Sequence, residues 1–158
     1  MLAAVIALLG VPQEAAARKI VEETRCTRTV VERGTEIEEY KGDRVCVDFQ
    51  QPREFQGIWV NQFEGIRFVE NARTLADIPT GDGIERVWFT IDEQTRMPAG
   101  WRSAPLGRAY RVRFRGRAAQ DMHRKPLDGY GHFGMSAGLV LVDELFEIED
   151  LGETSRSY

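Results

Sequence analysis

Residues 110–118 alternate strictly between apolar or small side chains and arginine. Side chains on a β-strand point to opposite faces with a period of two, so this pattern predicts a strand with one buried and one exposed face. A helix would instead repeat its apolar residues every three or four positions. The segment therefore predicts a β-sheet that covers a core. Its exposed face carries Arg111, Arg113, Arg115 and Arg117.

This arginine stripe supports two hypotheses. Alternate residues on a strand stand about 6.7 Å apart, which would let the four cations bind a ligand anion or track a phosphate backbone. Alternatively, the arginines pair with acids across the sheet, because Asp143, Glu147 and Glu149 share one face of the predicted final strand. We favour the second hypothesis, since the formal net charge of −4 gives the chain no general attraction to nucleic acid.

Runs of β-branched and aromatic residues recur between turn signals along the rest of the chain. The predicted strands are residues 20–32, 44–49, 58–61, 66–70, 86–91, 110–119 and 139–149. Residues 62–65, 79–83 and 128–131 are expected to form turns, and only residues 71–78 are expected to form a short helix. These elements predict a mainly β fold, a small closed or partly open antiparallel β-barrel with at most one short helix.

The N-terminal segment predicts export. Residues 1–11 carry no charge, and Ala15, Ala16 and Ala17 precede Arg18. An apolar run that ends in small residues is typical of a secretory signal peptide, so we expect cleavage after residue 17 and a single domain over residues 18–158. The alternative is an N-terminal helix packed on the domain. An apolar run of this length, at about 1.5 Å per residue, is too short for a hydrocarbon core of about 30 Å, so we expect no stable membrane span.

The chain contains two cysteines, Cys26 and Cys46. In an exported chain of periplasmic or secreted location, an even number of cysteines favours a disulfide, here closing a loop of about 20 residues and contributing about 3 kcal/mol. The alternative is two buried thiols in a cytosolic protein. No Cys-x-x-Cys motif is present to indicate a redox site.

Both histidines lie in one glycine-rich segment together with two aspartates, and these four residues are candidate metal ligands. They are Asp121, His123, Asp128 and His132. Their spacing matches no known metal motif, so we favour a structural role in which Tyr130 and Phe133 fill one end of the barrel. A metal-dependent enzyme centred on this segment is the alternative function.

The sequence offers no catalytic residue and no cofactor motif. Gly134, Ser136 and Gly138 match the Gly-x-Ser-x-Gly pattern of hydrolases, but a strand-like run follows the serine and no histidine follows it in the chain. No glycine-rich phosphate loop followed by Lys-Ser or Lys-Thr is present. We therefore expect no cofactor.

The order of the predicted elements is a long first strand, a hairpin, a short helical link, residues 110–119, a Gly-Tyr-Gly-His-Phe-Gly turn at residues 129–134 and an apolar final strand. This order resembles that of small OB-fold-like β-barrels in uncharacterised exported bacterial proteins. The resemblance implies a barrel over residues 20–150 that binds a ligand through one face and its loops.

These observations together predict a non-catalytic exported binding protein. The expected partner is a protein or an envelope component, with Trp59 or Trp101 as an anchor if either is exposed. Nucleic acid is not the expected partner, because the arginines of residues 110–118 alternate with the aromatic residues instead of sharing a face with them.

Overall fold

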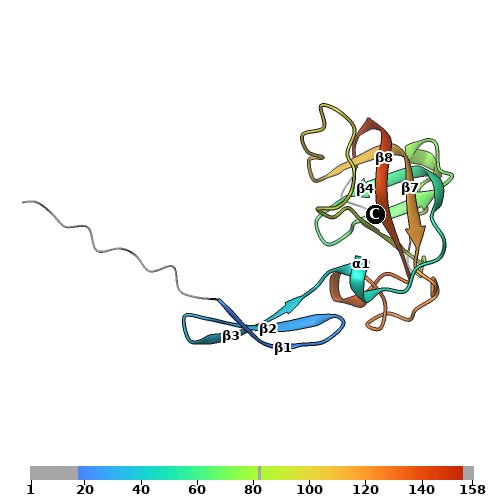
Figure 1. Cartoon of the computed structure of the whole chain (residues 1–158). Coiled ribbons are helices and arrows are strands. Elements are labelled where there is room, and N and C mark those ends of the chain that lie inside the picture. The colour runs from blue at the N-terminus through green and yellow to red at the C-terminus, as the bar shows by residue number, and fades with distance from the viewer. Residues whose placement is uncertain (1–17, 82, 155–158) are drawn as a thin grey trace, which may run out of the picture. The chain divides into compact units, whose positions relative to one another are not determined.

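The computed structural model describes residues 18–81 and 83–154 (Figure 1). The chain divides into two compact units, Met1–Cys46 and Val47–Tyr158. The predicted signal peptide, residues 1–17, lies outside the described residues. The single domain expected over residues 18–158 stays a prediction.

The first unit contains a three-stranded antiparallel sheet and one short helix. Strands β1 (Lys19–Glu23), β2 (Thr27–Glu32) and β3 (Thr35–Tyr40) pair in that order, and helix α1 (Asp43–Cys46) follows them. Val30 of β2 is buried and lies opposite Ile20 of β1 and Ile37 of β3 in the pairing register. Ile20 and Ile37 remain exposed, so only Val30 of this apolar row is buried, and every residue of β1 is exposed.

The second unit is a closed β-barrel. Its strands are β4 (Arg53–Asn61), β5 (Arg67–Glu70), β6 (Val87–Thr90), β7 (Arg108–Ala118) and β8 (Gly138–Glu153). They follow one another around the barrel in the order β4-β5-β6-β8-β7, and β7 pairs back onto β4. Figure 1 labels β4, β7 and β8 of this barrel. This architecture confirms the predicted mainly β barrel and is compatible with an OB-like fold.

The barrel sheet is mixed, because β6 and β8 run parallel while the other neighbouring strands run antiparallel. Parallel neighbours cannot be joined by a tight hairpin and need a longer connection. Here the chain leaves β6, forms β7 on the far side of β8, and returns through a second long connection to β8. The two long connections, 91–107 and 119–137, are therefore consequences of the strand order.

Aromatic rings fill the barrel interior. The Phe114 ring centroid lies 5.1 Å from that of Phe55 and 5.2 Å from that of Phe68, and the Trp59 and Phe89 centroids are also 5.1 Å apart. All five side chains are buried. Rings at these separations attract one another beyond the effect of apolar burial. The apolar face predicted for β7 faces this core, with Tyr110, Val112, Phe114 and Ala118 all buried.

Gly116 permits the close approach of β7 to β8. A Cβ atom at this position would lie 2.4 Å from the carbonyl oxygen of Leu141, a distance that side-chain carbons do not adopt. The pairing register also shifts between Arg115 and Gly116. Such shifts bend a strand and increase its twist, which a barrel of few strands needs in order to close.

Some predicted elements are wrong in detail. Residues 20–32 form two strands, because the chain turns after β1 and Thr24 accepts and donates hydrogen bonds within that turn. Residues 44–49 are not a strand, since the Gly42 carbonyl accepts hydrogen bonds from Val45 and Cys46 and starts α1. Residues 71–78 contain only a 3-10 turn, Leu75–Asp77. None of the helices in the described chain has the length and apolar character that a bilayer crossing requires.

Candidate functional site

The arginines of β7 form the predicted charge ladder with β8. Arg113 lies 2.6 Å from Glu147, Arg117 lies 2.7 Å from Asp143, and Arg111 lies 3.5 Å from Glu149. These are the three acids expected from the sequence. Arg115 is exposed and makes no ion pair with a described residue; the acid opposite it in register, Glu144, pairs instead with Arg96 at 2.5 Å.

Ion pairs between β7 and β8 also lower the pKa values of two acids. The Arg113 guanidinium, hydrogen-bonded to Glu147, holds the pKa of that carboxyl below its ordinary value. Arg108 at the start of β7 does the same to the pKa of Asp150, at a distance of 2.7 Å. Three arginines of the stripe are thus engaged by acids, and the ladder leaves little free positive charge for an anionic polymer.

The β7–β8 connection packs on the outside of the barrel. Tyr130 is buried against Leu139 and Leu141 of β8, and its hydroxyl donates to the Asp121 carbonyl at 2.9 Å. Gly131 lies against Trp88 of β6, where a Cβ atom would be only 2.2 Å from the indole ring. A glycine is therefore required at this contact, and the connection is held to β6 and β8.

The structure separates the two histidines of this connection. His123 Nδ1 lies 3.0 Å from Glu85 Oε2, whereas His132 Nε2 lies 3.2 Å from Glu64 Oε1. Asp121 accepts a hydrogen bond from the His123 amide and lies 3.5 Å from Arg124. Within residues 18–81 and 83–154, no three His, Cys, Asp or Glu side chains are grouped to hold a metal ion. The four candidate ligands, including Asp128, are therefore not brought together.

Phe133 does not fill the barrel end as expected. Its side chain is 74% exposed, while Tyr130 alone takes the buried position. Ser136 is buried, and its backbone pairs with that of Tyr130 at 2.7 and 3.0 Å. Trp59 belongs to the core and Trp101 packs against it, so neither is an exposed anchor.

A hollow of about 500 Å³ lies where exposed apolar side chains meet the barrel, and we call it the apolar hollow. It is lined by Gln62, Phe63, Glu64, Gly65, Arg86, Leu106, Gly107 and Thr154. Phe63 is 79% exposed and Leu106 is 61% exposed. Large apolar side chains that share an exposed hollow are typical of interaction sites rather than of an inert surface.

Hydrogen bonds hold the rim of the apolar hollow in place. The Gly107 amide donates to the Asn61 carbonyl at 2.7 Å, and the Thr154 amide donates to the Gly107 carbonyl at 2.8 Å. The Gln62 side-chain amide donates to the Thr154 hydroxyl at 2.8 Å. The ends of β4, β7 and β8 are thereby joined, and the exposed side chains project from a fixed scaffold.

A second hollow, of about 400 Å³, adjoins the first, and we call it the basic hollow. It is lined by Gly83, Ile84, Glu85, Arg86, His123, Arg124, Lys125, Pro126, Met135 and Ala137. Arg86 belongs to both hollows. Arg124 lies over the Tyr130 ring, with 4.4 Å between its guanidinium carbon and the ring centroid. The basic hollow thus combines three cations with apolar side chains such as Ile84 and Met135.

Four residues of the two hollows are not predicted from the sequence as site residues: Phe63, Arg86, Leu106 and Lys125. A signal for Phe63 is present, because this phenylalanine lies in the predicted turn 62–65, where an apolar ring has no strand face to bury it. Leu106 lies in a segment rich in Pro, Gly and Ser and is similarly placed. The cations carry no such signal, since isolated surface cations are common.

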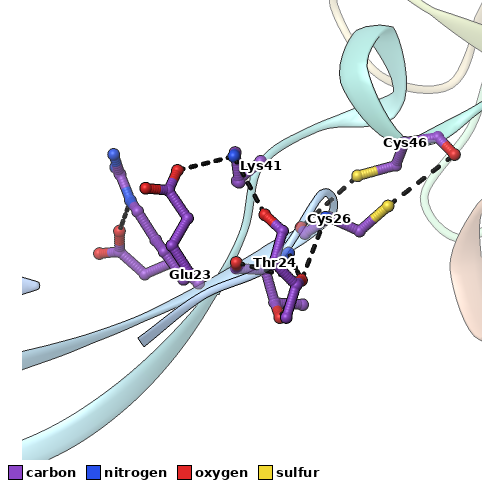
Figure 2. Close-up of polar contacts among 8 residues, drawn as sticks. Glu23, Thr24, Cys26, Lys41 and Cys46 are labelled. Atoms are coloured by element: carbon purple, nitrogen blue, oxygen red, sulfur yellow. Dashed lines mark hydrogen bonds and ion pairs between the residues drawn. The ribbon is translucent and has the colours of Figure 1, made fainter. Parts of the chain in front are cut away.

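The two cysteines lie close together in the first unit, as free thiols. Figure 2 shows each sulfur directed at the backbone of the other residue: Cys46 Sγ lies 3.5 Å from the Cys26 carbonyl oxygen, and Cys26 Sγ lies 3.9 Å from that of Cys46. Lys41 supports the same turn through Glu23 at 2.7 Å and the Thr24 carbonyl at 3.2 Å (Figure 2). Burial raises the pKa of the Cys46 thiol. Because both cysteines are free thiols, the predicted disulfide is not shown.

No protein-family model, curated protein or solved structure matches this chain.

Proposed function

We propose that this chain is an exported, non-catalytic binding protein whose barrel binds a protein partner at the apolar hollow. The observation that carries the proposal is that Phe63 and Leu106 line one hollow while remaining largely exposed. Burial of a large apolar side chain by a partner contributes about 1.5–3 kcal/mol, so two such residues on a fixed rim supply an anchor.

The barrel supports this proposal by its construction. The aromatic core and the closed sheet hold the connections that form the hollow, and binding residues commonly lie on loops positioned by such scaffolds. We assign the barrel to the OB-like group, which binds ligands through loops and one barrel face. Cleavage of residues 1–17 and a disulfide between Cys26 and Cys46 belong to the same proposal, because both suit an exported chain.

Alanine substitution in the hollow tests this function. The Phe63→Ala/Leu106→Ala variant and wild type are each used to recover partners from the exported fraction of the source cells. Leu127→Ala is the matched control, because Leu127 is 77% exposed and lines neither hollow. We expect one protein to be recovered stoichiometrically with wild type and with the control and to be lost with the double variant. Equal recovery by all three chains contradicts the proposal.

A further inference from the structure

The two hollows meet at a single side chain. Arg86 immediately precedes β6 and lines both the apolar hollow, with Phe63 and Leu106, and the basic hollow, with Lys125. A ligand that fills both hollows would therefore contact Arg86. An arginine at such a junction presents a planar set of N–H donors that matches a carboxylate in two hydrogen bonds.

Two of the three cations of the basic hollow have no acidic partner in the described chain, whereas the third, Arg124, lies 3.5 Å from Asp121. Neither Arg86 nor Lys125 makes an ion pair with any residue that the structure describes. The acid in the lining of this hollow, Glu85, contacts His123 instead. This local positive charge stands out in a chain with a formal net charge of −4. Free cations beside exposed apolar side chains are complementary to a ligand that carries both anionic and apolar groups.

We infer that the bound part of the partner is an acidic peptide segment with one bulky apolar side chain, an inference that rests on the function proposed above. Its carboxylates bind Arg86 and Lys125 in the basic hollow, and its apolar side chain packs between Phe63 and Leu106 in the apolar hollow. Hollows of about 400 and 500 Å³ are each large enough for a few side chains of such a segment.

An acidic peptide fits these observations better than a nucleic acid strand. A phosphate backbone carries a charge at every nucleotide, and it would meet Glu64 and Glu85 on the rims of the hollows. A peptide can place its carboxylates only where the cations are. The acidic chain as a whole also repels a long polyanion.

Selection from a displayed random peptide library tests the inference with the full chain. The peptides that bind are sequenced, and the strongest is synthesised with a fluorescent label for Kd measurements. We expect the selected peptides to share two or more Asp or Glu residues near one Leu, Ile or Phe. The Arg86→Gln/Lys125→Gln variant should raise the Kd about tenfold or more, and raising NaCl from about 50 to about 300 mM should weaken wild-type binding.

The control variant is Arg115→Gln, which removes an exposed arginine that also makes no ion pair with a described residue. It should leave the Kd unchanged, and all variants should keep the melting temperature of wild type. Selected peptides without acidic residues, an absence of selected peptides, equal Kd values for the two variants, or displacement of the peptide by an equimolar thymidine oligonucleotide would each overturn the inference.

Partner recovery with the Arg86→Gln/Lys125→Gln variant distinguishes failure of the inference from failure of the proposed function. If Arg86→Gln/Lys125→Gln recovers the partner as well as wild type does, while Phe63→Ala/Leu106→Ala does not, the apolar hollow binds a protein and the acidic-peptide inference is wrong. If Phe63→Ala/Leu106→Ala recovers the partner normally, the proposed function is wrong and the inference fails with it.

Discussion

The Nε2 atom of His132 lies 3.2 Å from the Oε1 atom of Glu64, so the β7–β8 connection contacts the β4–β5 connection that carries Phe63. The two connections are far apart in sequence, and they meet because they lead into β5 and β8, which both pair with β6. The same contact places the glycine-rich segment beside the apolar hollow, since Glu64 is one of the lining residues. His132 therefore lies beside the candidate binding site.

We expect Glu64→Ala to loosen the turn that holds Phe63 without unfolding the barrel. Both side chains of the pair are partly exposed, so the free energy of unfolding should fall by no more than about 1 kcal/mol. Hydrogen exchange should quicken at the Gly65 amide, which donates to the Gln62 carbonyl at 3.2 Å. Exchange at that amide equal to wild type would show that the contact does not restrain the turn.

We expect Gly131→Ala to be strongly destabilising. The added methyl group would meet the Trp88 ring at 2.2 Å, and the positive φ of +68° already disfavours any other residue. Together these effects should lower the free energy of unfolding by about 2–4 kcal/mol, measured by urea denaturation. Gly100→Ala is the control, because its φ is +81° but no atom lies within 4 Å, and it should cost only about 1–2 kcal/mol. Equal losses in the two variants would contradict the contact with Trp88.

The charge ladder predicts a specific pH dependence of stability. In the folded chain the pKa values of Glu147 and Asp150 lie below their ordinary values of 4.5 and 3.8. The stability that these acids contribute is therefore complete above their ordinary pKa values and is lost as the pH falls through the folded-state pKa values.

We expect Arg108→Gln/Arg113→Gln to melt below wild type at about pH 7 and the gap to shrink towards about pH 3. Differential scanning calorimetry across this range measures the gap. Arg115→Gln is the matched control, because Arg115 makes no ion pair with a described residue, and its melting temperature should follow that of wild type at every pH. A gap that stays constant with pH would show that the pairs do not contribute through ionisation.

Sequence periodicity predicts the parts of this chain that bury apolar side chains. The arginine alternation places β7 correctly and identifies its partners Asp143, Glu147 and Glu149, because a half-buried strand needs both a core face and a solvated face. Strand β3 is not predicted, since its sequence Thr-Glu-Ile-Glu-Glu-Tyr has few apolar residues and lies at a sheet edge. Its strand conformation depends on pairing with β2.

The residues of the candidate site could not be predicted from sequence periodicity. The apolar hollow forms where the ends of β4, β7 and β8 meet, so Phe63 and Leu106 become neighbours only through the closure of the barrel. Arg86 and Lys125 resemble other surface cations in the sequence. What distinguishes them is that they make no ion pair within the described chain and also line a hollow, a property of three-dimensional placement.

We expect Cys26 and Cys46 to form a disulfide under oxidising conditions. With glutathione disulfide as oxidant, the two thiols lose two electrons and two protons, and two glutathione thiols are released. The mass of the chain should fall by about 2 Da, and the first unit should gain about 3 kcal/mol in stability. The raised pKa of Cys46 should make the reaction faster as the pH rises. A stable mixed disulfide with glutathione on either cysteine would contradict the pairing.

The most direct test of the binding surface is photo-crosslinking from Phe63. A photoreactive phenylalanine analogue replaces Phe63 in one chain and Leu127 in another, and both are irradiated in the source cells. Because Phe63 lines the apolar hollow and Leu127 lines neither hollow, we expect a single discrete protein adduct from position 63 and none from position 127. No adduct from position 63, or the same adducts from both positions, would contradict the proposal that this hollow binds a protein partner.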